Sequence, residues 1–286
     1  MYKNVLENFE PNLRFYDLGE KPMVDDGFGT VAWAKPSKLT ATPTEATLTE
    51  GTTPSSTSFS YSVITATPVQ YGLFVELSDR LLVAAPTRIL ENAGTELANN
   101  LGRIVDQVIQ TEVMAGTNVI YGGNATSRAT VDATDTVSSS DLRRAQIKLR
   151  AANAPDFDGY YVAVMHPLVA GDLRAETNGE YIEFAKYATP DRLFAGEVGA
   201  IHGVRVVESA NVASFSSTVT VYPTLVVGRG AYGVTQWGSL EAVYKPLGSG
   251  EDPLNQKATI GVKIDFAAKR LQEDALVRIE TAATTI

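Results

Sequence analysis

Residues 30 to 77 limit what this chain can fold into, because they read as two long β-arms with little apolar surface. Between Ser37 and Thr67, 16 of 31 residues are Ser or Thr. An isolated two-stranded hairpin is only marginally stable in water, so arms of this length need another surface to pack against. We expect that surface to be a second copy of the chain. The second arm alternates apolar and polar positions, which places these apolar side chains on one face of an extended strand: Phe59, Tyr61, Val63, Val69, Tyr71, Leu73, Val75 and Leu77.

The composition excludes several classes of protein. With 286 residues, of which 44% are hydrophobic, the chain can build a core for one large or two modest domains. A net charge of −9 provides no general basic surface for nucleic acid, so any contact with DNA is expected to be weak or local. The absence of cysteine excludes disulfides and thiolate sites and fits a reducing cytoplasm. Neither a signal peptide nor a membrane span is expected, because no long apolar run occurs.

Residues 86–115 are predicted to form a long helix that begins at Pro86. Its apolar residues recur at intervals of three and four, and Gly102 lies beside this stripe, where another backbone can approach closely. The charged residues off the stripe, among them Glu91, Arg103 and Asp106, are either a solvated face or a face complementary to a neighbour. The two readings have equal weight. The stripe comprises Leu90, Ala93, Leu97, Leu101, Ile104, Val105 and Val108.

The rest of the chain mixes helices and strands, so the predicted fold class is α+β. Residues 1–27 read as an extended arm and residues 117–137 as irregular. A helix over 142–153 begins after the capping residues Ser139-Ser140-Asp141. The further elements expected along the chain are a strand over 160–165, a helix over 167–176, a segment over 184–187, and strands over 204–208, 218–227, 240–245, 259–266 and 276–280.

One segment matches a nucleotide-binding motif in its letters. Gly228-Arg229-Gly230-Ala231-Tyr232-Gly233 follows an apolar strand, as a dinucleotide fingerprint does. No helical pattern follows it, so no helix dipole would meet a pyrophosphate, and a Gly-rich corner between strands is the preferred reading. A nucleotide-binding enzyme that uses Gly228–Gly233 stays as the alternative. His166 and His202 are interpreted as structural turn or strand-end residues, so no catalytic residue, metal ligand or cofactor is predicted.

The order of these parts resembles the Hong Kong 97-type major capsid protein of tailed bacteriophages. Short stretches in order along the chain narrow the resemblance to the podophage branch typified by coliphage N-four. They are Leu48 to Pro54, Val69-Gln70-Tyr71-Gly72, Ser78-Asp79, Val119 to Gly123, His166-Pro167, Gly196 to Gly199, Gly203-Val204-Arg205, Asp252-Pro253-Leu254 and Gly261-Val262-Lys263.

The resemblance implies a division into five parts. They are an N-terminal arm (1–28), a hairpin called the E-loop (29–77), a first part of the peripheral P-domain with the spine helix (78–137), an axial A-domain (138–230), and a second part of the P-domain (231–286). It further implies a structural protein, not an enzyme, that assembles into pentamers and hexamers as an icosahedral shell around double-stranded DNA. The chain would be assembled in the host cytoplasm and located in the virion.

The implied partners are other copies of the chain, a portal, a possible decoration protein, and packaged DNA through weak non-specific contact, with no membrane. Because only about 27 residues precede the hairpin, a separate scaffold protein, or none, is expected. The residues expected at subunit interfaces are Glu50, Gly51, Pro54, Phe59, Tyr61, Val63, Tyr71, Leu73, Glu91, Arg103 and Asp106.

Overall fold

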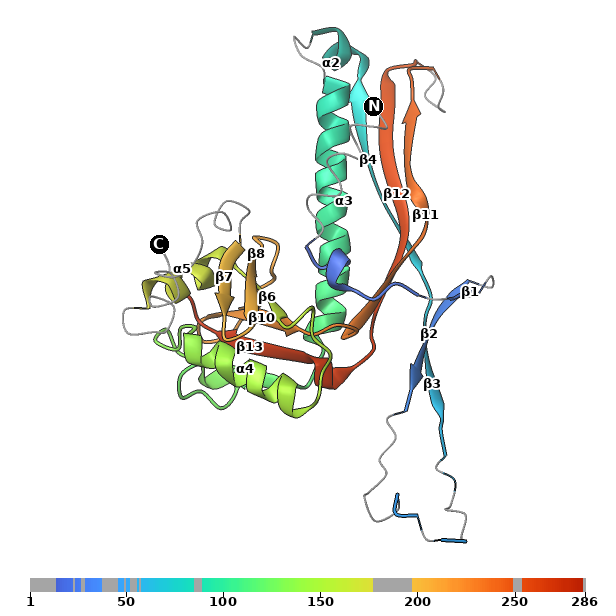
Figure 1. Ribbon diagram of the computed structural model, residues 1–286. Helices are drawn as coiled ribbons and strands as arrows, with labels where there is room; N and C mark the ends of the chain where they lie inside the picture. The colour runs from blue at the N-terminus through green and yellow to red at the C-terminus, as the bar shows by residue number, and fades with distance from the viewer. Residues whose placement is uncertain are drawn as a thin grey trace.

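The computed structural model consists of a long helix lying along a narrow sheet, a second and wider sheet with helices, and a β-ribbon that projects from both (Figure 1). Each of the two larger sheets combines strands from separated segments of sequence, whereas the three strands of the ribbon follow one another in the chain. The structure describes residues 14–22, 24–26, 29–37, 46–48, 50–51, 56, 58–84, 89–176, 197–248 and 254–284.

The long helix α3 (Ile89–Met114) confirms the helix that the apolar spacing predicts. Gly102 is buried on its inner face, as its place beside the stripe indicates. Pro86, the expected first residue, lies outside the described residues. A short helix, α2 (Asp79–Ala84), precedes α3 and has no counterpart in the sequence prediction. The buried face of α3 comprises Gly94, Leu97, Ala98, Leu101, Gly102, Val105, Asp106, Ile109, Gln110 and Val113.

The sheet beside α3 has three antiparallel strands in the order β11 (Tyr232–Lys245), β12 (Lys257–Arg270) and β4 (Val69–Ser78). Tyr71 and Leu73 of β4 pack against the main core of the chain, and Leu77 is buried. The expectation that the second arm has no core within its own chain is therefore wrong for these residues. The reason is that β4 pairs with β12 over its whole length, which turns every second side chain toward α3.

The wider sheet has the strand order β5-β13-β10-β6-β8-β7, with β9 paired to β10. Helices α4 (Ser139–Ala151) and α5 (Pro167–Ala175) lie on one side of it. Residues 231–286 are divided between the two sheets, because β13 pairs with β10 and β5. The strands are β5 (Val119–Tyr121), β6 (Tyr161–Met165), β7 (Glu197–Ile201), β8 (Val204–Glu208), β9 (Phe215–Ser216), β10 (Thr220–Val227) and β13 (Leu276–Thr281).

The connection 117–137, which the sequence indicates as irregular, is held to this sheet by a buried carboxylate. Arg128, in the 3-10 helix η3 (Arg128–Thr130), donates two hydrogen bonds to Glu280, at 2.8 and 2.6 Å. The Arg278 guanidinium forms an ion pair with the same carboxylate at 2.7 Å, although it is not aligned as a hydrogen bond. Because Glu280 is fully buried, the two cations are what compensate its desolvation.

The projecting ribbon is an antiparallel sheet of β1 (Val24–Asp26), β2 (Thr30–Pro36) and β3 (Tyr61–Ala66). In Figure 1 it leaves the body near the lower end of α3 and points away from both larger sheets. Pairing of Pro36 with Tyr61 and of Val31 with Ala66 confirms that the two predicted arms meet as a hairpin. Phe184 to Tyr187, a predicted element, lies outside the described residues.

Residues 14–22, here called the N-terminal strap, cross over the body and include the 3-10 helix η2 (Tyr16–Leu18). Phe15 is fully buried, and the backbone N–H groups of Arg14 and Phe15 donate to the Asp106 carboxylate of α3 at 3.2 and 3.3 Å. The Tyr232 hydroxyl donates to the Phe15 carbonyl at 2.6 Å. We expected Asp106 off the apolar stripe, but it is buried. The reason is that its carboxylate accepts hydrogen bonds from the backbone N–H groups of the strap, which covers it.

The ionisation of Asp106 predicts how stability varies with pH. Burial raises the pKa of Asp106 to about 6, against the opposing effect of the two backbone donors. The pKa of an aspartate in an unfolded chain is about 3.9. At pH values between the two pKa values, the folded chain therefore binds more protons than the unfolded chain. The free energy of unfolding should therefore fall as pH rises through this window, by at most about 3 kcal/mol.

Urea unfolding of the native chain and of Asp106→Asn at several pH values between 4 and 7.5 measures this effect. The difference between the two proteins isolates Asp106, because the asparagine does not titrate. We expect the native chain to lose stability relative to the variant up to about pH 7 and then to change no further. A difference that is constant with pH, or that grows in favour of the native chain, would contradict the assignment.

Gly233 provides a second prediction, because Trp33 of β2 lies directly against its backbone. A Cβ added at Gly233 would overlap the Trp33 ring, whereas one added at Gly171 of α5 would meet nothing within 4 Å. Gly233→Ala should lower the free energy of unfolding by about 1–3 kcal/mol, because the indole is forced from its site. Gly171→Ala, the control, should be neutral or stabilising. Thermal unfolding compares them, and equal melting temperatures would refute the close approach.

Candidate subunit interface

The ribbon exposes large apolar side chains that no part of the described chain covers. Phe59, Tyr61 and Val63 are 53%, 63% and 61% exposed. The Phe59 and Tyr61 rings form an edge-to-face pair with centroids 4.9 Å apart. Such a pair is a preorganised apolar surface, and contiguous exposed apolar surface of this kind is typical of a binding site for another protein. The structure thus places these three predicted interface residues together.

The other predicted residues of the hairpin are only partly described. Glu50 and Gly51 are exposed, and Gly51 has a φ of +78°, a conformation that favours glycine in a turn. Pro54 lies outside the described residues. At the base of the ribbon, Trp33 is 5% exposed and donates its Nε1–H to the Glu20 carbonyl at 3.4 Å. The ribbon is therefore exposed at Phe59, Tyr61 and Val63 and anchored at its base through Trp33.

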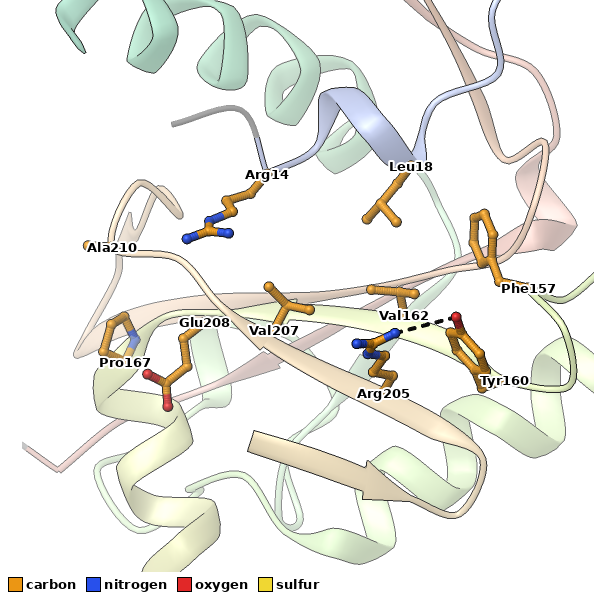
Figure 2. Close-up of a pocket in the computed structure, with 10 residues that line it drawn as sticks. All are labelled: Arg14, Leu18, Phe157, Tyr160, Val162, Pro167, Arg205, Val207, Glu208 and Ala210. Carbon is orange, nitrogen blue, oxygen red and sulfur yellow. Dashed lines mark hydrogen bonds between the residues drawn. The ribbon is translucent and has the colours of Figure 1, made fainter. Parts of the chain in front are cut away.

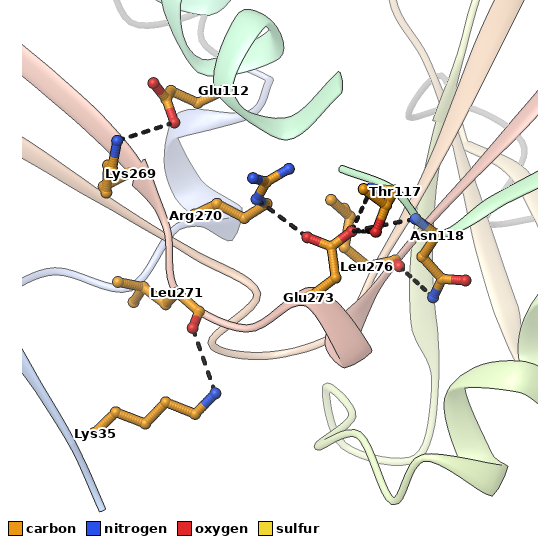
Figure 3. Close-up of polar contacts among 9 residues, drawn as sticks. All are labelled: Lys35, Glu112, Thr117, Asn118, Lys269, Arg270, Leu271, Glu273 and Leu276. Atoms are coloured by element: carbon orange, nitrogen blue, oxygen red, sulfur yellow. Dashed lines mark hydrogen bonds and ion pairs between the residues drawn. The ribbon is translucent and has the colours of Figure 1, made fainter. Parts of the chain in front are cut away.

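A polar junction fixes this base to the end of α3 and to the strand β12 (Figure 3). Lys35 of β2 donates to the Leu271 carbonyl at 3.4 Å, and Lys269 pairs with Glu112 of α3 at 3.8 Å. Next to them, Glu273 lies in the 3-10 helix η5 (Glu273–Ala275). Ribbon, helix and narrow sheet thus meet within a few residues of the point where the chain crosses to the wide sheet.

Glu273 is the acceptor at this junction. It accepts hydrogen bonds from the backbone N–H groups of Thr117 and Asn118 and from the Thr117 hydroxyl, and it pairs with Arg270 at 3.2 Å. Burial opposes its charge, but these donors together hold the pKa of Glu273 below its usual value. Glu273 therefore stays ionised near neutral pH and ties the end of α3 to the start of β13.

The outward face of the narrow sheet carries a shallow groove of about 430 Å³. Phe74 is 70% exposed beside it, and Val243 is 39% exposed. Gly72 and Gly261 line the groove and make it deeper, because neither residue has a side chain that would fill it. Sequence reasoning missed Phe74, since it followed the other face of the strand, the one with Tyr71 and Leu73. A single large apolar residue among polar ones on that second face was the available signal.

The spine helix contributes less exposed surface than its sequence indicates. Arg103 is exposed, Glu91 is half-buried, and Asp106 is fully buried beneath the strap. The helix therefore exposes Arg103 and part of Glu91 to solvent, while Asp106 is covered.

A second hollow, of about 540 Å³, lies between the N-terminal strap and the strands β6 and β8 (Figure 2). Arg14 points into it from the strap, and Arg205 points into it from β8 beside Tyr160. The Arg205 Nη1 lies 3.5 Å from the Tyr160 hydroxyl oxygen. Glu208, at its edge, pairs with Arg174 outside it. Its walls are otherwise apolar.

The enzyme alternative has no support in the geometry of Gly228–Gly233. The segment leads into the strand β11, not into a helix, and Gly230 has a φ of +70° as in a tight corner. His166 caps α5, because its Nδ1 accepts the Leu168 N–H at 3.2 Å, and burial lowers its pKa. His202 lies in the turn between β7 and β8 with a φ of 50°. Both histidines occupy the strand-end and turn positions that the sequence indicates.

Two features are absent from the described residues. No cluster of three or more His, Asp or Glu side chains there is arranged to hold a metal ion. Within the same residues, no helix combines the length and apolar character needed to cross a membrane.

Comparison with known proteins gives a match to the family described as phage capsid protein, over residues 61–279. The major capsid protein of Pseudomonas phage KPP21 is 24% identical over 201 residues. That match covers 57% of this chain and 51% of the relative, so the chain matches about half the length of this curated relative.

Solved structures with the same fold cover nearly the whole chain. The capsid of Ralstonia phage GP4 has a TM-score of 0.73 at 18% identity, over 93% of this chain and 87% of that one. The cyanophage Pam1 capsid has a TM-score of 0.69 at 16% identity, over 98% and 93%. These similarities confirm the α+β, Hong Kong 97-type capsid fold. Since the family match includes the spine helix and both larger sheets, the chain belongs to the phage capsid protein family.

Proposed function

We propose that this chain is the shell-forming major capsid protein of a tailed phage, and that its copies assemble as pentamers and hexamers around double-stranded DNA. One observation carries the proposal: Phe59, Tyr61 and Val63 are exposed to solvent and belong to neither of the apolar cores that the described residues form. Membership of the capsid family supports a structural role, located in the virion, over an enzymatic one.

The partner surface that fits the ribbon best is the outward groove of the narrow sheet on an adjacent copy. Phe74 and Val243 provide apolar contact there, and the bare backbone at Gly72 and Gly261 lets a flat ring approach closely. Because ribbon and groove are different surfaces of one chain, each copy can bind the next head to tail. Interfaces of this heterologous type close into rings when the rotation between copies allows.

Further contacts complete the proposed shell. Arg103 of α3, which is exposed, and Glu91, which is half-buried, would contact a neighbouring copy, and Glu50, Gly51 and Pro54 would extend the contact at the tip of the hairpin. The order of short sequence stretches from Leu48 to Lys263 supports the N-four-like branch of the family. A portal, a separate scaffold and a decoration protein are the partners that such a shell requires or accepts, with assembly in the host cytoplasm.

A triple substitution tests the role of the ribbon. Phe59→Ser, Tyr61→Ser and Val63→Ser together remove the exposed apolar surface. Because all three side chains are solvent-exposed in the single chain, the melting temperature of unassembled subunits should change little. Shell formation, followed by electron microscopy and sedimentation, should be lost.

The matched control is Phe59→Tyr, Tyr61→Phe and Val63→Ile, which keeps the apolar surface and should still form shells. Normal shells from the serine variant would refute the proposed role of the ribbon. Loss of folding in the serine variant, seen as a lowered melting temperature, would show that these side chains serve the single chain instead.

A further inference from the structure

The N-terminal strap is tied to the spine helix at its first residues. The Phe15 carbonyl accepts from the Tyr232 hydroxyl at 2.6 Å. The backbone N–H groups of Arg14 and Phe15 donate to Asp106 of α3, at 3.2 and 3.3 Å. The Asn211 side chain hydrogen-bonds the same carboxylate. Because Asp106 is fully buried, its charge depends on such donors, and two of them belong to the strap.

The other end of the strap holds the base of the ribbon. The Glu20 N–H donates to the Tyr232 carbonyl at 2.9 Å, and the Glu20 carbonyl accepts from the Val234 N–H at 3.0 Å. The same carbonyl accepts from the Trp33 Nε1–H at 3.4 Å, and Trp33 is 5% exposed. Glu20 therefore joins the ribbon strand β2 to the narrow-sheet strand β11, and the strap connects this joint to Asp106.

The strap itself buries little apolar surface. Phe15 is its only fully buried residue, and Tyr16 and Leu18 are half-buried, while its charged residues are exposed. The hollow of about 540 Å³ lies between the strap and the strands β6 and β8 (Figure 2). A segment with few buried apolar contacts opens locally at a lower free energy than the core. The strap therefore has the character of a unit that opens while the two larger sheets stay folded.

We propose that the strap is a latch, held closed at Asp106, and that it fixes the direction of the ribbon while it is closed. Opening of the latch breaks the hydrogen bond between Trp33 and Glu20 and exposes Asp106 to water. The closed latch thus adds a second fixed point to the contact of Lys35 with the Leu271 carbonyl. The inference rests on the proposed function only for its effect on assembly, in which the ribbon binds an adjacent copy.

Asp106 makes the latch depend on pH. Burial raises the pKa of Asp106 to about 6 when the latch is closed. In the open latch the carboxyl group meets water, where the pKa of an aspartate is about 3.9. The closed form therefore binds a proton more tightly than the open form. The equilibrium constant for opening should rise with pH between these two values, by up to about 100-fold.

The groups around Asp106 do not reverse this direction. Among the described residues, the charged or titratable groups on the elements packed there are Arg14 and Asp17 of the strap and Tyr232 of β11. Arg14 favours the ionised carboxylate, but burial has the larger effect on the pKa of Asp106. Burial, with the charges of Asp106 and Asp17, raises the pKa of Tyr232, which therefore stays neutral.

Hydrogen exchange in unassembled full-length subunits, followed by NMR between pH 4 and 7.5, tests the inference. The indole N–H of Trp33 reports on the ribbon base, and that of Trp237, which is 37% exposed, is the internal reference. After correction for intrinsic exchange, protection of the Arg14, Phe15 and Glu20 amides and of the Trp33 indole should fall together as pH rises, by up to about 100-fold. The strap amides should also exchange faster than the amides of β10 at every pH.

Two variants isolate the role of Asp106. In Asp106→Asn the side chain does not titrate, so protection of the strap and of the Trp33 indole should not vary with pH. Asp17→Asn is the matched control, because it removes an exposed carboxyl group from the same strap. It should retain the pH profile of the native chain. The native profile also stands alone as a test if Asp106→Asn does not fold.

Three results would overturn the inference. Strap amides that exchange no faster than those of β10 would show that the strap opens only when the whole chain unfolds. A pH profile that is flat in the native chain, or the same in Asp106→Asn, would show that Asp106 does not hold the latch. A strap that responds to pH while the Trp33 indole does not would show that the ribbon is not coupled to it. Because these measurements use unassembled subunits, their failure leaves the shell test of the serine variant unaffected.

Discussion

The close approach of Trp33 to the backbone at Gly233 is the constraint on which the rest of the structure depends. A Cβ at Gly233 would overlap the indole, so only glycine lets the ribbon strand β2 lie against the start of β11. The N-terminal strap closes over the same place, where Glu20 pairs with Gly233 and the Tyr232 hydroxyl holds Phe15. Since the ribbon is fixed at this point and by the contact of Lys35 with the Leu271 carbonyl, its direction is set while Phe59, Tyr61 and Val63 stay exposed.

This arrangement separates folding from assembly. The core is complete within one chain, because α3 and the narrow sheet bury each other and the wide sheet buries its own helices. The ribbon adds little to that core, and its dense Ser and Thr content keeps it compatible with water before a partner binds. Association then depends on moderate apolar contacts repeated in every copy, which suits a shell in which each subunit has several neighbours.

The elements with strong local periodicity were predictable from the sequence. Helix α3, the strands β6, β8, β10, β12 and β13, and the pairing of the two arms all follow from local spacing. The sequence does not show with which other strand each strand of the two larger sheets pairs. The alternation in the second arm runs from Phe59 to Val63 and resumes in the same phase at Val69. The residues up to Ala66 nevertheless pair within the ribbon, and those from Val69 pair with β12, far away in the sequence. Such pairing is decided by tertiary packing, which local patterns do not encode.

Asp106 shows a further limit of the sequence. We expected it off the apolar stripe, but it lies four residues after Gly102 and three before Ile109, which are both on the buried face of the helix. Its charge argued for solvent, and the deciding partners, two backbone N–H groups of the strap, have no sequence signature.

Hydrogen exchange of backbone amides before and after assembly tests the central claim most directly. Amides of residues 58–66 should exchange rapidly in unassembled subunits and become strongly protected in purified shells, because the ribbon is then covered by an adjacent copy. Amides of β12 should be protected in both states, since that strand is already paired on both sides within one chain. Equal exchange of residues 58–66 in subunits and shells would contradict the account, because it would mean that assembly leaves the ribbon in solvent.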